Sequence, residues 1–291
     1  MNVTRMLQEK AKISGIPLWV VEKDYALSYL LAGIAGVPDL GDRVVLKGGT
    51  ALKKAYFKDY RFSEDLDYST LVPGPLPDIE ALMNTVVQLS EELLQEKGPF
   101  RAHVERLVLR EPHPGEQGAF TVRVQFPYQC SPMCRLRVEI TVDEPVLLIP
   151  ELRPILHDFD ESYSTEVEVY PLAEIVAEKL RAILQSQARL HKRGWGASRV
   201  CRDYYDLWRV LKSRNFMQVN IPDLTAQKCA HRAIEFQSPN SFFATDLIAV
   251  ARAEWEKQLL PFVADCPTSE LVLQELEGML IELWGGGYHG K

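Results

Sequence analysis

One stretch of the chain carries residue types that handle phosphates and metal ions. Gly48, Gly49 and Thr50 follow the run VVLK, which is apolar up to its lysine. Fourteen residues separate Thr50 from Asp65, the first of the two aspartates Asp65 and Asp67. A glycine turn that leads into a helix presents backbone N–H groups at the positive helix end, which suits a phosphate. Two neighbouring carboxylates repel each other unless a cation lies between them. The stretch therefore predicts a phosphate-binding turn beside a Mg²⁺ site.

The two aspartates are two residues apart in SEDLDYS, so on a strand both side chains point to the same face, together with Ser63. The later segment RLRVEITVD alternates apolar and polar residues, and its polar face carries Glu139 as a third candidate metal ligand. Mg²⁺ prefers one or two carboxylates together with substrate phosphates. The alternative interpretation is a strand face that carries acids by chance, and the residues leave open which aspartate is essential.

Two charged residues fall on the apolar stripes of later helices. Lys179 lies four residues from both Ile175 and Ile183, and Asp203 lies beside Val200. A buried charge must be paired or must serve a site. We therefore expect either a structural ion pair, or a lysine that binds nucleotide phosphates with an aspartate that positions it or acts near the attacking hydroxyl. Asp206 is expected to be a supporting or solvated residue.

A basic run covers the same region. No acidic residue occurs from position 179 to 202, where the basic residues are Lys179, Arg181, Arg189, Lys192, Arg193, Arg199 and Arg202. In an acidic protein this run suits a nucleotide or an RNA backbone. A solvated loop is the alternative. Within the run, Trp195 stands between two glycines and is either a stacking platform for a base or a packing cap.

These residues must be positioned by an α/β half followed by a helical half. Helices are predicted at 18–34 and about 78–96, and TALKKAYFK predicts a helix with Thr50 near its N-cap. Strands are predicted in DRVVLKGG, SEDLDYS, HVERLVLR, AFTVRVQF, RLRVEITVD. After TEVEVYP, Pro171 opens a helix and strand patterns largely vanish, which predicts a domain boundary near 165–170.

The composition limits the class of protein. The chain has 291 residues, of which 46% are hydrophobic and 25% charged, with a net charge of -7. These values are typical of a globular protein and exclude a uniformly basic nucleic-acid coat. No apolar run approaches the ~18 residues of a membrane span. The five cysteines lack C-x-x-C spacing, which favours reduced thiols in a cytoplasmic protein.

Five separated motifs, EKDYAL, LKGGTALKKAYF, RFSEDLDYS, AEKLRAI and RDYYDLW, run in this order between about residues 21 and 208. Together they resemble the AbiEii-like nucleotidyltransferase toxins of type IV toxin–antitoxin systems, which include the mycobacterial MenT toxins. The resemblance implies an α+β fold, with a DNA-polymerase-β-like nucleotidyltransferase core on a mixed sheet in residues 1–168. An all-helical domain in residues 169–291 would contribute a lysine and an aspartate to the cleft.

The resemblance also implies roles for particular residues. The catalytic set would be Asp65, Asp67, Lys179 and Asp203, and the substrate-binding set Gly48, Gly49, Thr50, Ser63 and Lys179, with Asp65, Asp67 and Glu139 on Mg²⁺. The implied reaction moves a nucleoside monophosphate from an NTP to RNA, with the 3′ end of a tRNA as the expected acceptor, and blocks growth. An antitoxin would be the protein partner, without a membrane. Transfer to a protein or a small molecule, and a non-catalytic nucleotide- or partner-binding module, remain the alternatives.

Overall fold

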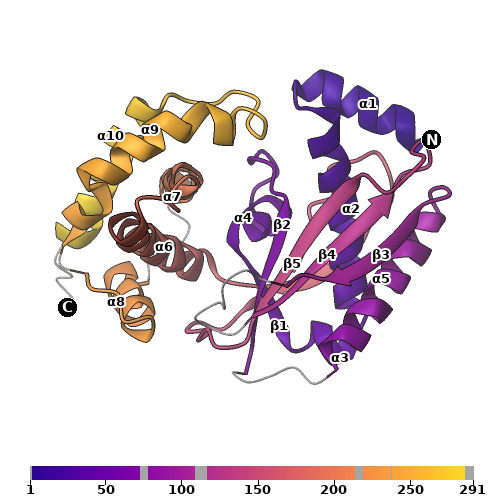
Figure 1. The fold of residues 1–291 in the computed structure, drawn as a ribbon, viewed down its shortest axis with the longest axis horizontal. Coiled ribbons are helices and arrows are strands. Elements are labelled where there is room, and N and C mark those ends of the chain that lie inside the picture. The colour runs from indigo at the N-terminus through magenta and orange to yellow at the C-terminus, as the bar shows by residue number, and fades with distance from the viewer. Residues whose placement is uncertain (1, 73–77, 109–116, 214–218, 237, 286–291) are drawn as a thin grey trace. The chain divides into compact units, whose positions relative to one another are not determined.

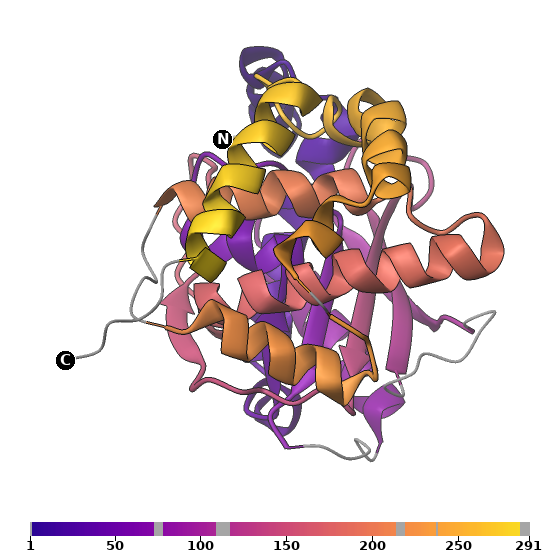
Figure 2. The same ribbon diagram turned by 90° about the vertical axis from the view of Figure 1, so that its left-hand side faces the viewer.

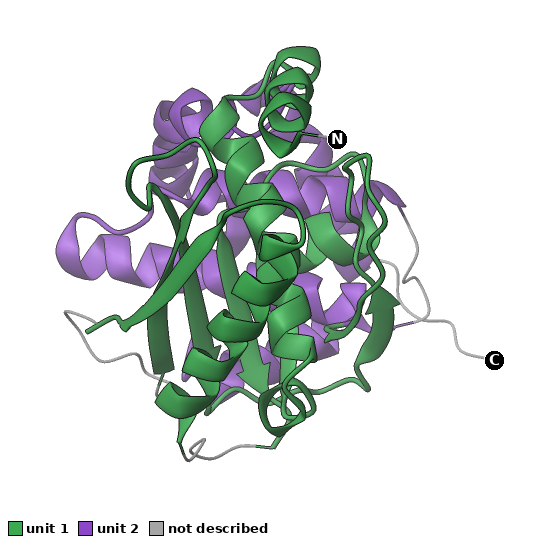
Figure 3. Cartoon of the chain, turned by 90° about the vertical axis from the view of Figure 1, so that its right-hand side faces the viewer, with its two compact units in different colours: residues 1–170 green, residues 171–291 purple. Residues whose placement is uncertain are grey.

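The computed structural model describes residues 2–72, 78–108, 117–213, 219–236 and 238–285. The chain divides into two compact units, residues 1–170 and residues 171–291, which Figure 3 colours separately. The first unit contains the sheet, and the described part of the second is helical.

The described residues of the first unit form a seven-stranded mixed sheet with the strand order β3-β4-β5-β2-β1-β7-β6. The pairs β2–β5 and β1–β7 are parallel, and the other neighbours are antiparallel. The strands are β1 (Val44–Lys47), β2 (Asp65–Thr70), β3 (Arg101–Arg106), β4 (Gln117–Gln125), β5 (Cys134–Thr141), β6 (Glu151–Pro154) and β7 (Glu166–Val169). The α+β fold class with a mixed sheet and a helical C-terminal region is confirmed.

Helices cover one face of this sheet (Figures 1 and 3). They are α2 (Leu18–Ala35), α3 (Pro38–Gly41) and α5 (Ile79–Gln95), and α1 (Val3–Ser14) packs against α2. Helix α2 packs against α5 and against β5 and β7, and it is buried along most of its length. The apolar residues of β5 form the matching sheet face, since Leu136, Val138 and Ile140 are fully buried. The polar residues that alternate with them therefore point to the opposite face of the sheet.

The segment between β1 and β2 is helical but not a regular α-helix. A short helix α4 (Gly48–Ala51) continues into a π-helical turn η1 (Leu52–Tyr56), in which the Phe57 N–H donates to the Leu52 carbonyl over 2.9 Å. The π turn places two adjacent lysines in the interior. Lys54 pairs with Asp24 over 2.8 Å, with both side chains buried, and Lys53 donates to the Lys58 carbonyl over 2.7 Å.

The EKDYAL motif on α2 fastens this segment to the core. Lys54 also donates to Ser28 Oγ over 3.0 Å, one turn beyond its Asp24 partner. Burial lowers the pKa of Lys54, and the Asp24 carboxylate opposes that shift. One residue earlier, Lys23 pairs with Glu64 over 2.7 Å, directly before β2. Helix α2 therefore holds both the turn after β1 and the approach to β2.

The second unit is built from helices (Figures 1 and 2). They are α6 (Leu172–Arg193), α7 (Val200–Ser213), α8 (Ile221–His231), the 3₁₀ turn η2 (Pro239–Phe243), α9 (Thr245–Leu259) and α10 (Ser269–Gly285). Helix α6 packs against α7 and α8, and α7 packs against α9 and α10. Lys228 of α8 and Glu174 of α6 form an ion pair at 2.8 Å with both side chains fully buried.

Candidate active site

The glycine turn at the end of β1 lies directly against side chains of the following segment. Gly48 has φ +73°, a left-handed conformation that glycine adopts without strain. A Cβ atom at this position would lie 3.0 Å from Asp67 Oδ2. A Cβ atom on Gly49 would lie 2.6 Å from Arg61 Nη2 and 3.2 Å from Ser63 Oγ. The structure thus brings four of the predicted site residues together, Gly48, Gly49, Ser63 and Asp67.

Thr50 has a different role from the one its hydroxyl suggested. The side chain is 1% exposed, and its hydroxyl donates a short hydrogen bond to the backbone carbonyl of Asp65. The N-cap of α4 is Lys47, so Thr50 lies near the N-cap as predicted, in the first turn, but it is not the capping residue. The hydroxyl is held inside the protein and ties the turn to β2.

The predicted carboxylates share the polar sheet face. Asp65 and Asp67 alternate with the buried Leu66 along β2. Asp67 is the register partner of Glu139 on the parallel strand β5, so these two carboxylates are direct cross-strand neighbours. Glu139 forms an ion pair with Arg137, and it accepts a hydrogen bond from Gln117 over 2.7 Å. Within the described ranges, no three His, Cys, Asp or Glu side chains group as a metal-holding cluster.

Three basic residues lie in this region that were not predicted as site residues from the sequence. Lys47 is the register partner of Asp67 on β1, and Arg137 is the register partner of Asp65 on β5. Arg61 is 5% exposed and lies beside Gly49. The strand alternation alone indicates that Arg137 shares a face with Glu139. That Arg137 also lies opposite Asp65 could not be predicted, because it depends on the register of two strands that are distant in sequence.

The helical unit holds its predicted lysine between two aspartates. Lys179 Nζ lies 2.9 Å from Asp203 Oδ1 and 2.7 Å from Asp206 Oδ2. The Asp206 side chain is fully buried, whereas that of Asp203 remains 23% exposed. Asp206 was expected to be a supporting or a solvated residue, and of these two interpretations its burial excludes the solvated one. Because Asp203 and Asp206 are one helical turn apart on α7, one lysine on α6 can contact both.

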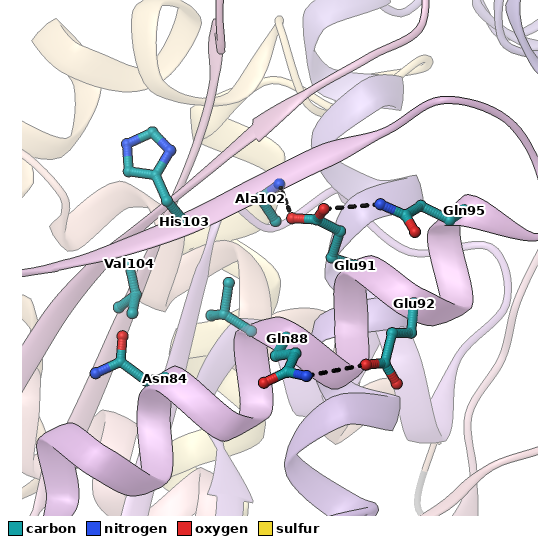
Figure 4. A pocket seen from close by; sticks show the side chains of 9 residues that line it. Asn84, Gln88, Glu91, Glu92, Gln95, Ala102, His103 and Val104 are labelled. Carbon is teal, nitrogen blue, oxygen red and sulfur yellow. Dashed lines mark hydrogen bonds between the residues drawn. The ribbon is translucent and has the colours of Figure 1, made fainter.

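A pocket of about 430 Å³ lies between α5 and β3 (Figure 4). Its lining is mostly polar, and several of these groups already bond one another. Glu91 accepts from the Ala102 N–H over 2.8 Å and from Gln95 over 2.7 Å, and Gln88 donates to Glu92 over 3.1 Å. None of the predicted site residues lines this pocket. Separately, none of the described helices is long and apolar enough to cross a bilayer.

The chain is similar to known nucleotidyltransferases in sequence and in fold. The model of the family described as "Nucleotidyl transferase AbiEii toxin, Type IV TA system" matches residues 29–275. The crystal structure of a candidate nucleotidyltransferase from H. pylori is similar in fold, with a TM-score of 0.51 and 19% identity, over 89% of this chain and 94% of that chain. None of the curated proteins matches the chain. The family match covers most of the chain, so the protein is a nucleotidyltransferase that belongs to the AbiEii toxin family of type IV toxin–antitoxin systems.

Proposed function

We propose that the protein is a Mg²⁺-dependent toxin that transfers a nucleoside monophosphate from an NTP to RNA, with the 3′ end of a tRNA as the acceptor, in the cytoplasm. Membership of the family implies an NTP substrate and an antitoxin partner. The observation that carries the proposal is the contact between the glycine turn and a carboxylate, with Gly48 against Asp67. A phosphate held on the backbone of the turn would lie beside a carboxylate that can share a cation with it.

The donor set fits Mg²⁺. Asp65 and Asp67 supply oxygen ligands on one sheet face, which suits a hard cation that takes one or two carboxylates together with substrate phosphates. We assign these two aspartates as the main ligands. Glu139 is a third ligand or an orienting neighbour, because Arg137 and Gln117 already engage its carboxylate. When bound, Mg²⁺ would neutralise charge on the phosphates during the displacement.

The remaining residues of the first unit position the triphosphate. Gly48 and Gly49 allow close backbone approach, and the Ser63 hydroxyl beside Gly49 can donate to a phosphate oxygen. Arg61, also beside Gly49, adds positive charge to this end of the turn. Thr50 contributes its backbone only, since its hydroxyl is bonded to Asp65.

Lys179 and Asp203 complete the proposed residue set, on the strength of the motifs AEKLRAI and RDYYDLW and of their ion pair. Asp206 fixes the lysine from the buried side. Asp203 is the more exposed of the two aspartates, so it is the one that can also meet a substrate. We propose that Lys179 carries charge for the phosphates and that Asp203 orients the lysine or the attacking hydroxyl.

The experiment that tests this function is a transfer assay with each of the four labelled NTPs, offered total RNA in one reaction and total protein in another. We expect label in RNA, dependent on Mg²⁺. The Asp67→Asn variant should lose transfer by at least about a hundredfold, on the scale of removing a charge-stabilising group. Asp39→Asn is the matched control, because Asp39 is an exposed carboxylate on α3. Label in protein alone would refute the RNA acceptor, and equal growth arrest by wild type and Asp65→Ala would refute catalysis as the cause of toxicity.

A further inference from the structure

The turn between α6 and α7 exposes the basic run that the proposed chemistry leaves unused. We call residues 189–199 the basic turn. Its exposed basic side chains are Arg189, Lys192, Arg193 and Arg199. Trp195 at the centre of the turn is 64% exposed, so its interpretation as a packing cap is wrong. The net charge of the chain is -7, so this local cluster of positive side chains is unusual for it. A ligand with negative charges and a flat aromatic group would complement the cations and the exposed indole.

Two glycines fix the indole in this outward position. Gly194 has φ +74° and closes α6, with its N–H donating to the Leu190 carbonyl over 2.7 Å. Gly196 has φ +103°, which residues with a Cβ atom rarely adopt. A Cβ atom on Gly194 would meet no neighbour, and one on Gly196 would make only an ordinary contact with Arg189. The backbone conformation, and not packing, therefore requires the two glycines that flank Trp195.

The basic side chains of the turn lie close together. The Arg193 guanidinium lies 5.6 Å from the centroid of the Trp195 ring, within the range of a cation–π contact. Although Arg189 is exposed, partial desolvation lowers its pKa, and the neighbouring charges of Arg181 and Arg193 lower that pKa further, against the attraction of Asp203. An acidic side chain also meets the turn, since Asp246 pairs with His191 over 2.8 Å. The exposed cations beside the exposed indole form a surface that suits an anionic ligand.

We propose that the basic turn binds a single-stranded segment of the RNA acceptor, with an unpaired base stacked on Trp195 and the phosphates on either side held by Lys192 and Arg193. This inference rests on the proposed RNA acceptor. Cations combined with an aromatic platform are how proteins hold single strands without reading their sequence. An acidic protein segment would also attract the cations, but it would leave the exposed indole without the flat partner that a base supplies.

The test measures binding of a fluorescein-labelled single-stranded oligouridine to the full chain. We expect Trp195→Ala to weaken binding roughly 5- to 150-fold, the range measured for one stacked base, and Trp195→Phe to restore much of it. The double variant Lys192→Glu/Arg193→Glu should lower the slope of log affinity against log salt by about 1.4, for two single-strand phosphate contacts. The matched control is Arg5→Glu/Lys12→Glu, which reverses two exposed charges on α1.

The same variants in the transfer assay separate this inference from the proposed function. If the inference holds, the basic-turn variants raise the KM for RNA. Their KM for the NTP stays within about twofold of wild type, and their thermal midpoint stays within a few degrees of it. If wild type labels RNA and the basic-turn variants bind RNA as tightly as wild type does, the inference is overturned and the proposed function stands. An equal loss in the control would overturn the inference too, because net charge would then explain the effect. Wild type that labels no RNA would overturn the proposed function and the inference together.

Discussion

Replacing Gly48 by alanine tests whether the contact between the glycine turn and Asp67 serves transfer. The added Cβ atom would lie 3.0 Å from Asp67 Oδ2, whereas ordinary contacts begin at 3.4 Å, so the carboxylate must move by about 0.4 Å. A 1 Å misplacement at a reacting centre costs ~100-fold, so we expect a loss of transfer of roughly 5- to 10-fold. In the Gly48→Ala variant, the positive φ of this position would also strain the alanine and destabilise the folded state by about 1–2 kcal/mol.

A second glycine separates the two effects. Gly15 closes α1 with φ +67°, nearly the same conformation, but a Cβ atom there would meet nothing within 4 Å. Gly15→Ala should therefore lose about 1–2 kcal/mol of unfolding free energy in urea and keep wild-type transfer. Gly48→Ala should lose at least as much stability and also lose transfer. Full transfer by Gly48→Ala, with the same stability as Gly15→Ala, would refute our account of the turn.

Three further changes follow from the contacts. Lys179→Met leaves the fully buried Asp206 without this cation, so it should lower the unfolding free energy by about 3–5 kcal/mol. The double variant Lys179→Met/Asp206→Leu should recover much of this loss, and urea denaturation measures both changes. Burial raises the pKa of Glu161, but hydrogen bonds and nearby positive charge outweigh it and leave the pKa lowered. Its ionised form thus stabilises the fold above about pH 4.5, and this contribution is lost as the pH falls further, so stability should fall less steeply with acid in Glu161→Gln. Glu139→Gln should raise the Mg²⁺ concentration for half-maximal transfer much less than Asp67→Asn does, and an equal rise would make Glu139 a full ligand.

The regular elements could be predicted because their patterns are strong. Helix α2 carries apolar residues at helical spacing on both sides of its charged EKD segment, and it runs over residues 18–35 against the predicted 18–34. The alternation in RLRVEITVD predicted β5 and its buried face. The strand β6 was not predicted, because its four residues Glu151–Pro154 alternate only between partly and fully exposed positions at a sheet edge.

The candidate site could be predicted only where its residues are close in sequence. The turn and the two aspartates lie within one stretch, so their types and spacing were informative. The π turn η1 was missed because LKKAY has an ordinary helical composition, and the burial of Lys54 depends on Asp24 of a distant helix. The inward position of Asp206 was missed for a similar reason, since Lys179 on another helix supplies its counter-charge.

The most direct test of the central claim is the labelled transfer assay on wild type and on Asp67→Asn, with Asp39→Asn as control. We predict Mg²⁺-dependent label in RNA from wild type and from Asp39→Asn, and a loss of at least about a hundredfold in Asp67→Asn. Transfer that survives in Asp67→Asn, or label that enters only protein, would contradict the account.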